Sequence, residues 1–149
     1  MSEATRDFIL HHPSGIEISS LLQPAEVARF DGASEDDMGN GVIWYSLPVS
    51  EIEGEDVTIR LCFAGNRLHM ISLGLADENK YGSGWNDWSE AKERTRAAHT
   101  ERWLRGMGYT PGQYDWGEVW VGYDEKGASG GAGISFKAEH DVASNPNQP

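Results

Sequence analysis

Two apolar runs joined by a short turn constrain the fold of this chain more than any other feature. Residues 57–63 and residues 68–75 are both apolar β-type runs, and the segment between them contains Gly65 and Asn66. Such a pair of runs predicts an antiparallel hairpin. Both faces of the second run are apolar, which favours a central strand covered by a helix on one side and by loops or a partner on the other. An ordinary two-sided core gives the same pattern.

A single long helix is expected over about residues 88–107. Asp87 and Glu90 have a spacing like that of a capping box at its start, and Gly108 is a natural stop at its end. The charges of Glu93 and Arg96 fall on the core-facing arc, so the first half of the helix either begins outside the core or uses them in a partly buried contact. The side chains expected to pack on the sheet are His99, Thr100, Trp103, Leu104 and Met107.

The rest of the chain reads as strands and turns. Residues 116–123 and 132–136 flank a turn and predict a C-terminal hairpin, whereas residues 31–40 are rich in acids and turn formers and predict an exposed loop. Because strands are grouped before one helix, we expect a single α+β domain over residues 1–137. It has a predominantly antiparallel sheet with the main helix packed on one face. Residues 138–149 have no apolar period and are expected to form a disordered tail.

Charge limits the classes of partner. The net charge of −12 argues against nucleic-acid binding, which needs clustered Lys and Arg, and it favours a basic partner, although negative charge also serves solubility. No run approaches the roughly 20 apolar residues that span a bilayer, and no signal-peptide core is present, so we expect a cytoplasmic protein without a membrane partner. The expected docking acids form two clusters: Glu35, Asp36 and Asp37, and Glu51, Glu53, Glu55 and Asp56.

No motif for catalysis or for a metal was found. The five histidines do not have the helical spacing of a zincin, and Cys62 lies in an apolar run where a free thiol behaves as a small core residue. The glycine-rich residues 127–133 precede a strand and lack the Gly-Lys-Ser/Thr ending of a phosphate loop, so they predict a hairpin tip. We therefore expect no cofactor, no metal and no enzymatic activity. An enzyme with dispersed acidic residues stays a less favoured alternative.

The tryptophans fall into two groups. Trp103, Trp116 and Trp120 lie in the expected helix and strands and are assigned to packing, with a sugar-stacking role as the alternative. Trp85 and Trp88 lie in a polar loop, where an exposed pair is a plausible partner anchor. They are equally well explained as a hydrophobic staple that folds back over the start of the helix.

Residues 94–136 carry a resemblance to a known class of proteins. The segment has Arg94-x4-His99-x3-Trp103-Leu, then Gly108, Trp-Gly-x-Val, Tyr-Asp-x-Lys-Gly and a closing Ile-Ser-Phe136. In this it resembles small bacterial proteins that we associate with the immunity proteins of polymorphic toxin systems. The resemblance implies an antitoxin that neutralises a basic toxin by forming a tight complex, and it transfers no catalytic residue. The alternative is a small-ligand or carbohydrate-binding module that uses exposed tryptophans; the oligomeric state stays open.

Overall fold

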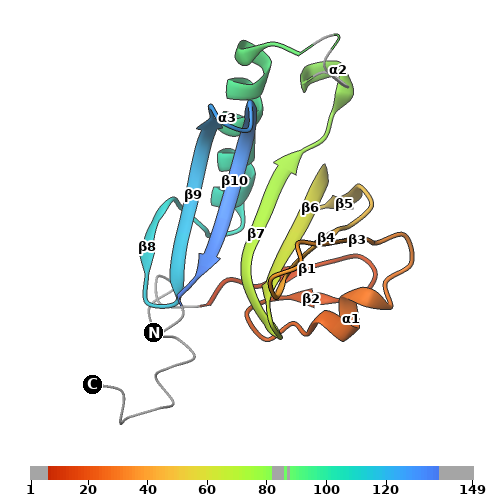
Figure 1. Ribbon diagram of the computed structural model, residues 1–149. Coiled ribbons are helices and arrows are strands. Elements are labelled where there is room, and N and C mark those ends of the chain that lie inside the picture. The colour runs from red at the N-terminus through yellow and green to blue at the C-terminus, as the bar shows by residue number, and fades with distance from the viewer. Residues whose placement is uncertain (1–6, 82–85, 87, 138–149) are drawn as a thin grey trace.

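The computed structural model describes residues 7–81, 86 and 88–137, and its centre is an antiparallel sheet of eight strands. One long helix, α3 (Glu90–Gly106), lies against one face of this sheet, and the C-terminal strands form a hairpin (Figure 1). The expected α+β class, with a mostly antiparallel sheet and one main helix, is therefore confirmed. The predicted tail at residues 138–149 lies outside the described residues.

The strands follow an order that places the two long hairpins side by side. The order is β3 (Ser34–Asp37), β4 (Val42–Ser46), β6 (Glu55–Ala64), β7 (Arg67–Leu75), β10 (Ser129–Phe136), β9 (Gly117–Asp124) and β8 (Gly112–Tyr114). An additional short strand, β5 (Ser50–Ile52), pairs with the first residues of β6. The β6–β7 and β9–β10 hairpins confirm the two predicted from the sequence. They join where β7 pairs with β10, with Ile71 opposite Ile134.

The acidic segment predicted as a loop is the main correction to the strand assignment. Residues 34–37 form the edge strand β3, which pairs with β4 so that Asp36 lies opposite Trp44. All four side chains of β3 are exposed. Asp and Glu are rare in strands, but an edge strand needs only one partner and its side chains stay in water. The backbone pairing with β4 therefore outweighs the poor strand propensity.

The N-terminal segment closes the lower end of the core. It contains β1 (Leu10–His11), β2 (Glu17–Ile18) and the short helix α1 (Pro24–Ala28), which begins at Pro24 as the sequence indicates. Phe8 is fully buried, and its ring lies 4.7 Å from that of Tyr109 and 6.3 Å from that of Trp116. These aromatic contacts fix the segment beneath the end of α3.

Helix α3 begins two residues later than predicted, because Ser89 is its N-cap. The Ser89 hydroxyl accepts a hydrogen bond from the Lys92 amide at 3.1 Å, which satisfies one of the free donors at the helix start. The predicted capping residue Asp87 lies outside the described residues. At the other end the helix stops at Gly106, and Gly108 follows with a φ of 96°.

The charges in the first half of α3 are in a partly buried contact, one of the two arrangements expected. Glu93 is only 5% exposed; its carboxylate accepts a hydrogen bond from the Gly130 amide at 3.0 Å and pairs with Arg96 at 3.1 Å. The Arg96 guanidinium also donates to the Leu75 carbonyl at 2.5 Å. This network ties α3 to both β7 and β10.

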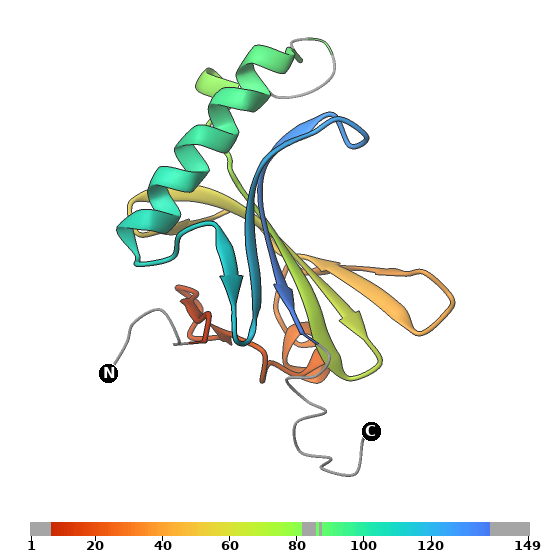
Figure 2. The same cartoon turned by 90° about the vertical axis from the view of Figure 1, so that its left-hand side faces the viewer.

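The two faces of the sheet have different surroundings. Val57, Ile59 and Leu61 of β6, and the residues opposite them on neighbouring strands, face α3 and the N-terminal segment and form the buried core; we call this the helix-covered face. The residues between them point to the opposite side, which we call the open face. Figure 2 shows α3 and the N-terminal segment gathered on one side of a strongly bent sheet.

Candidate functional site

The predicted acidic residues are not brought into one cluster. Asp36 lies on β3, opposite Trp44 and therefore level with Cys62 of β6, whereas Glu51 lies opposite Asp56 at the start of β6. The six residues from Asp56 to Cys62 correspond to about 20 Å along a strand. The two clusters are therefore separate sites on the same half of the sheet.

The strand register divides the acids between the faces. Asp36, Glu51 and Asp56 belong to the rows that point to the open face, and Glu118 of β9 joins them there because it pairs with Ser135. Glu35 and Asp37 lie on the alternate rows of β3, and Glu55 lies on the alternate row of β6. Only part of the predicted docking set thus shares one surface.

Glu35 lies beside the hydroxyl of Tyr45 on the helix-covered side of the sheet edge. Burial of Tyr45, and then the negative charge and hydrogen bonding of Glu35, raise the pKa of that phenol above its ordinary value. Asp37 instead accepts a hydrogen bond from the Gly39 amide at 2.8 Å, which fixes the turn after β3. Both acids therefore have local structural contacts.

The open face has small residues at its centre and tryptophans on either side. One row across the sheet contains Arg60, Ser72, Gly133 and Trp120, each directly opposite the next. The adjacent row contains Trp44, and the Arg60 guanidinium lies 4.5 Å from the centre of its ring. The small side chains of Ser72 and Gly133 therefore form a shallow depression in the open face, and Trp44 and Trp120 stand higher on either side of it.

Trp120 is the most exposed large aromatic side chain among the described residues, at 45%. A Cβ at Gly122 would lie 3.2 Å from its indole ring, so the ring rests over that glycine. The sequence assigned Trp120 to packing together with Trp103 and Trp116; those two are 8% and 0% exposed, but the assignment is wrong for the exposed face of Trp120. Only the register with β10 could have shown which face it occupies.

Two like charges face each other at the end of the open face. Glu51 and Asp56 are directly opposite in the β5–β6 ladder, and both side chains are exposed. Like charges at opposed positions of an antiparallel pair destabilise it. Folding alone therefore gives no reason for this pair, whereas binding a cation or a basic surface would remove the repulsion.

Trp88 does not stand free in its loop. Its indole N–H donates a hydrogen bond to the Ala128 carbonyl in the β9–β10 turn at 2.8 Å, and its side chain is half-buried. Trp88 therefore packs back onto the protein, as the second of the two sequence interpretations expected. It connects the β9–β10 turn to the segment before α3, however, and does not cap the helix. Trp85 lies outside the described residues.

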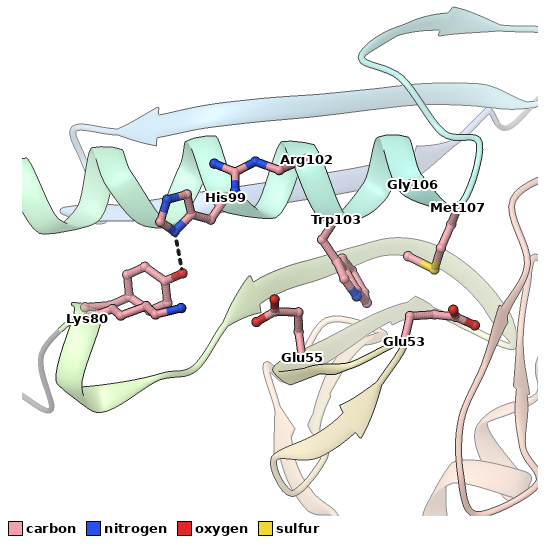
Figure 3. A pocket seen from close by; sticks show the side chains of 9 residues that line it. Glu53, Glu55, Lys80, His99, Arg102, Trp103, Gly106 and Met107 are labelled. Atoms are coloured by element: carbon pink, nitrogen blue, oxygen red, sulfur yellow. Dashed lines mark hydrogen bonds between the residues drawn. The ribbon is translucent and has the colours of Figure 1, made fainter.

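A second polar site lies on the helix-covered side, in a cleft of about 340 Å³ that we call the α3 cleft (Figure 3). Its walls come from the β5–β6 turn, from α2 (Glu78–Tyr81) and from the second half of α3. Trp103 fixes the geometry, because its indole N–H donates to the Ile52 carbonyl at 2.9 Å. The lining residues are Glu53, Glu55, Lys80, Tyr81, His99, Arg102, Trp103, Gly106 and Met107.

Tyr81 is the most deeply buried polar group that lines the α3 cleft. It is 2% exposed, its hydroxyl lies 2.8 Å from Nδ1 of His99, and Arg96 stacks over its ring at 5.0 Å. Burial, followed by the nearby charges of Glu55 and Asp77, raises the pKa of Tyr81. The phenol is therefore neutral at physiological pH and serves as a hydrogen-bonding group.

Sequence reasoning found only Glu53 and Glu55 of this cleft. The other lining residues come from α2 and from the end of α3: His99, Trp103 and Met107 from the face expected to pack on the sheet, and Arg102 from the opposite face. Only the fold brings them near the β5–β6 turn. The part of the chain that the structure describes contains no group of three His, Cys, Asp or Glu side chains arranged to hold a metal ion. None of its helices is long and apolar enough to cross a membrane.

No protein-family profile, curated protein or solved structure matches this chain.

Proposed function

We propose that this protein binds a basic protein partner on the open face of its sheet and that, as an immunity protein does, it neutralises a toxin by forming this complex. The observation that carries the proposal is the composition of the open face. It combines an exposed tryptophan, small central residues and the acids Asp36, Glu51, Asp56 and Glu118. Side chains of α3 approach this face at its end near Gly74, where Arg96 is adjacent.

The size of the face suits a protein partner. From β4 to β9 there are four strand spacings, or about 19 Å, and β6 is ten residues long, or about 33 Å. Together these give a surface of about 600 Å², to which the raised rims add. A stable interface buries about 800 Å² on each partner, so the open face is of the right order.

Protection of the sheet edge does not account for all of these acids. Charged side chains on an edge strand prevent sheets from pairing with each other, and this explains β3. Asp56 and Glu118, however, lie on strands that are paired on both sides, with β5 and β7 around β6 and with β8 and β10 around β9. Their charges face outward from the body of the sheet, where they support attraction of a basic surface.

The aromatic side chains supply a central contact. Trp120 presents nearly half of its surface to solvent, and tryptophans are among the residues that most often dominate protein interfaces. Trp44 and Arg60 lie across the low middle of the face from it. A partner with a protruding element flanked by Lys or Arg would fit between them.

The test measures affinity for the product of the adjacent open reading frame by titration calorimetry. The double reversal Asp36→Lys with Asp56→Lys changes the open face, and Glu17→Lys with Asp31→Lys changes the net charge equally among exposed residues elsewhere. We expect the first pair to weaken binding at least about tenfold and the second to change it less than about threefold. Equal losses in the two double variants would show that only net charge matters and would contradict the proposal.

The immunity role has its own readout. Cells that express the adjacent gene product should survive when the wild-type protein is co-expressed and die with the Asp36→Lys, Asp56→Lys variant at equal protein level. Full protection by that variant would contradict neutralisation through the open face, even if the two proteins bind each other.

A further inference from the structure

We propose that the α3 cleft is a separate binding site for a small zwitterion with an apolar side chain, of the chemical class of a free amino acid such as leucine. The cleft is lined by α3 and by Glu55, which lies on the helix-covered row of β6, so the inference does not rest on the proposed function of the open face.

Charges of both signs line the cleft without neutralising each other. Glu53 and Glu55 come from the β5–β6 turn, and Arg102 comes from α3. No hydrogen bond or ion pair joins any of these three side chains to another described residue. Glu55 is half-buried, and the exposed side chains of Glu53 and Arg102 line the same cavity from two different elements, so they are free to pair with a ligand.

The arrangement of the charges fits a zwitterion better than a single ion. Figure 3 shows Glu55 and Lys80 on one side of the cleft, with His99 and Arg102 on the helix that faces them. An ammonium group would lie against the carboxylate of Glu55, and a carboxylate would bind the Arg102 guanidinium in a two-pronged contact. Lys80, on the same side of the cleft as Glu55, is only weakly engaged by Asp77 at 4.0 Å.

An apolar surface adjoins the charged groups. Trp103 and Met107 line the cleft one and two turns along α3 from His99, and Trp103 is held rigidly by its hydrogen bond to Ile52. Small-molecule sites typically have volumes of about 300 to 1,000 Å³ and combine apolar walls with a few fixed polar groups. At about 340 Å³ the α3 cleft is at the small end of this range, which matches a single amino acid.

One wall of the α3 cleft is held in a fixed position by contacts within the protein. Tyr81 is buried, stacked under Arg96 and hydrogen-bonded to His99, so the wall between α2 and α3 is already in place without a ligand. Fixed groups lose little conformational entropy on binding, which raises affinity.

The experiment titrates the full-length protein with leucine, leucinamide and 4-methylpentanoate in a calorimeter. Leucinamide lacks the carboxylate and 4-methylpentanoate lacks the ammonium, so a zwitterion site should bind leucine at least about tenfold more tightly than either. Leucine binding should fall at least about tenfold in Arg102→Gln and in Glu55→Gln.

Arg105→Gln is the matched control, since Arg105 lies one turn along α3, pairs with Glu101 and does not line the cleft. Its leucine affinity should stay within about twofold of wild type, and circular dichroism checks that each variant is folded. The inference is overturned if leucine does not bind at millimolar concentration, if either analogue binds as tightly as leucine, or if Arg102→Gln and Glu55→Gln bind like wild type.

Discussion

A single added methyl group on β10 distinguishes the two faces of the sheet. Gly130 lies on the helix-covered side, where a Cβ would overlap the Glu93 carbonyl oxygen and lie 3.3 Å from the Cβ of Ala97. Its amide also donates to the buried Glu93 carboxylate. Gly130→Ala therefore has to push α3 away from the sheet or break this hydrogen bond.

The cost follows from these two contacts. Overpacking a tight contact costs about 2 kcal/mol, and loss of a hydrogen bond to a buried charged group adds about 1.5 kcal/mol. We expect Gly130→Ala to lower the free energy of unfolding by about 2 kcal/mol if the hydrogen bond is kept and by about 3.5 kcal/mol if it is lost. For a chain of this length the fall in Tm is then about 4 to 14 °C.

Gly133→Ala is the matched control, three residues along the same strand. Its Cβ would point to the open face with the nearest atom, the Ile71 carbonyl oxygen, 4.0 Å away. Since Ala restricts the unfolded chain more than Gly does, this variant should be neutral or gain about 0.5 kcal/mol. Urea denaturation and a thermal melt of both variants measure the difference. Equal stabilities would refute the reasoning that α3 packs against one face of β10 while the other stays open.

Two further changes test local features. Glu53 has a φ of 49° and precedes Gly54 at 83°, a turn that suits Asn at the first position; Glu53→Asn should therefore stabilise the protein by about 0.5 to 1 kcal/mol in urea denaturation. Glu53→Val should destabilise it, and equal effects of the two substitutions would exclude turn strain as the cause. Burial lowers the pKa of His12 below 6.5, and Nδ1 accepts a hydrogen bond from the Ser14 amide, so the folded state holds the neutral ring. Unfolding then takes up a proton, so the stability contributed by the neutral ring is complete above pH 6.5 and is lost as the pH falls below it. Denaturation midpoints between pH 7.5 and 5 should fall more for wild type than for His12→Gln, and parallel curves would contradict this.

The parts of the fold that sequence alone predicted are those with strong local signals. Residues 57–63 and 68–75 alternate or are apolar throughout and surround a Gly-Asn turn, so their hairpin was predictable. The length of α3 was predictable to within two residues at its start. The strand at residues 34–37 was missed because its acids favour a loop locally, and only the long-range pairing with β4 overrides that preference.

The candidate sites depend on long-range pairing even more strongly. Sequence identified the acids but not their faces, because the side of the sheet on which Asp36 or Asp56 lies is set by the register of neighbouring strands. Trp120 looked like a packing residue for the same reason. The α3 cleft brings Glu55 opposite Arg102, 47 positions later, and no local pattern reports such a contact.

The central claim, that a basic protein binds the open face, is tested most directly by the indole N–H signals of the six tryptophans in a ¹⁵N-labelled sample. Trp44 and Trp120 lie on the open face, whereas Trp103 and Trp116 are in the core, and single Trp→Phe variants assign the signals. On addition of the adjacent gene product, we expect the signals of Trp44 and Trp120 to shift and those of Trp103 and Trp116 to stay in place. A complex that forms and leaves the signals of Trp44 and Trp120 unchanged would contradict the account.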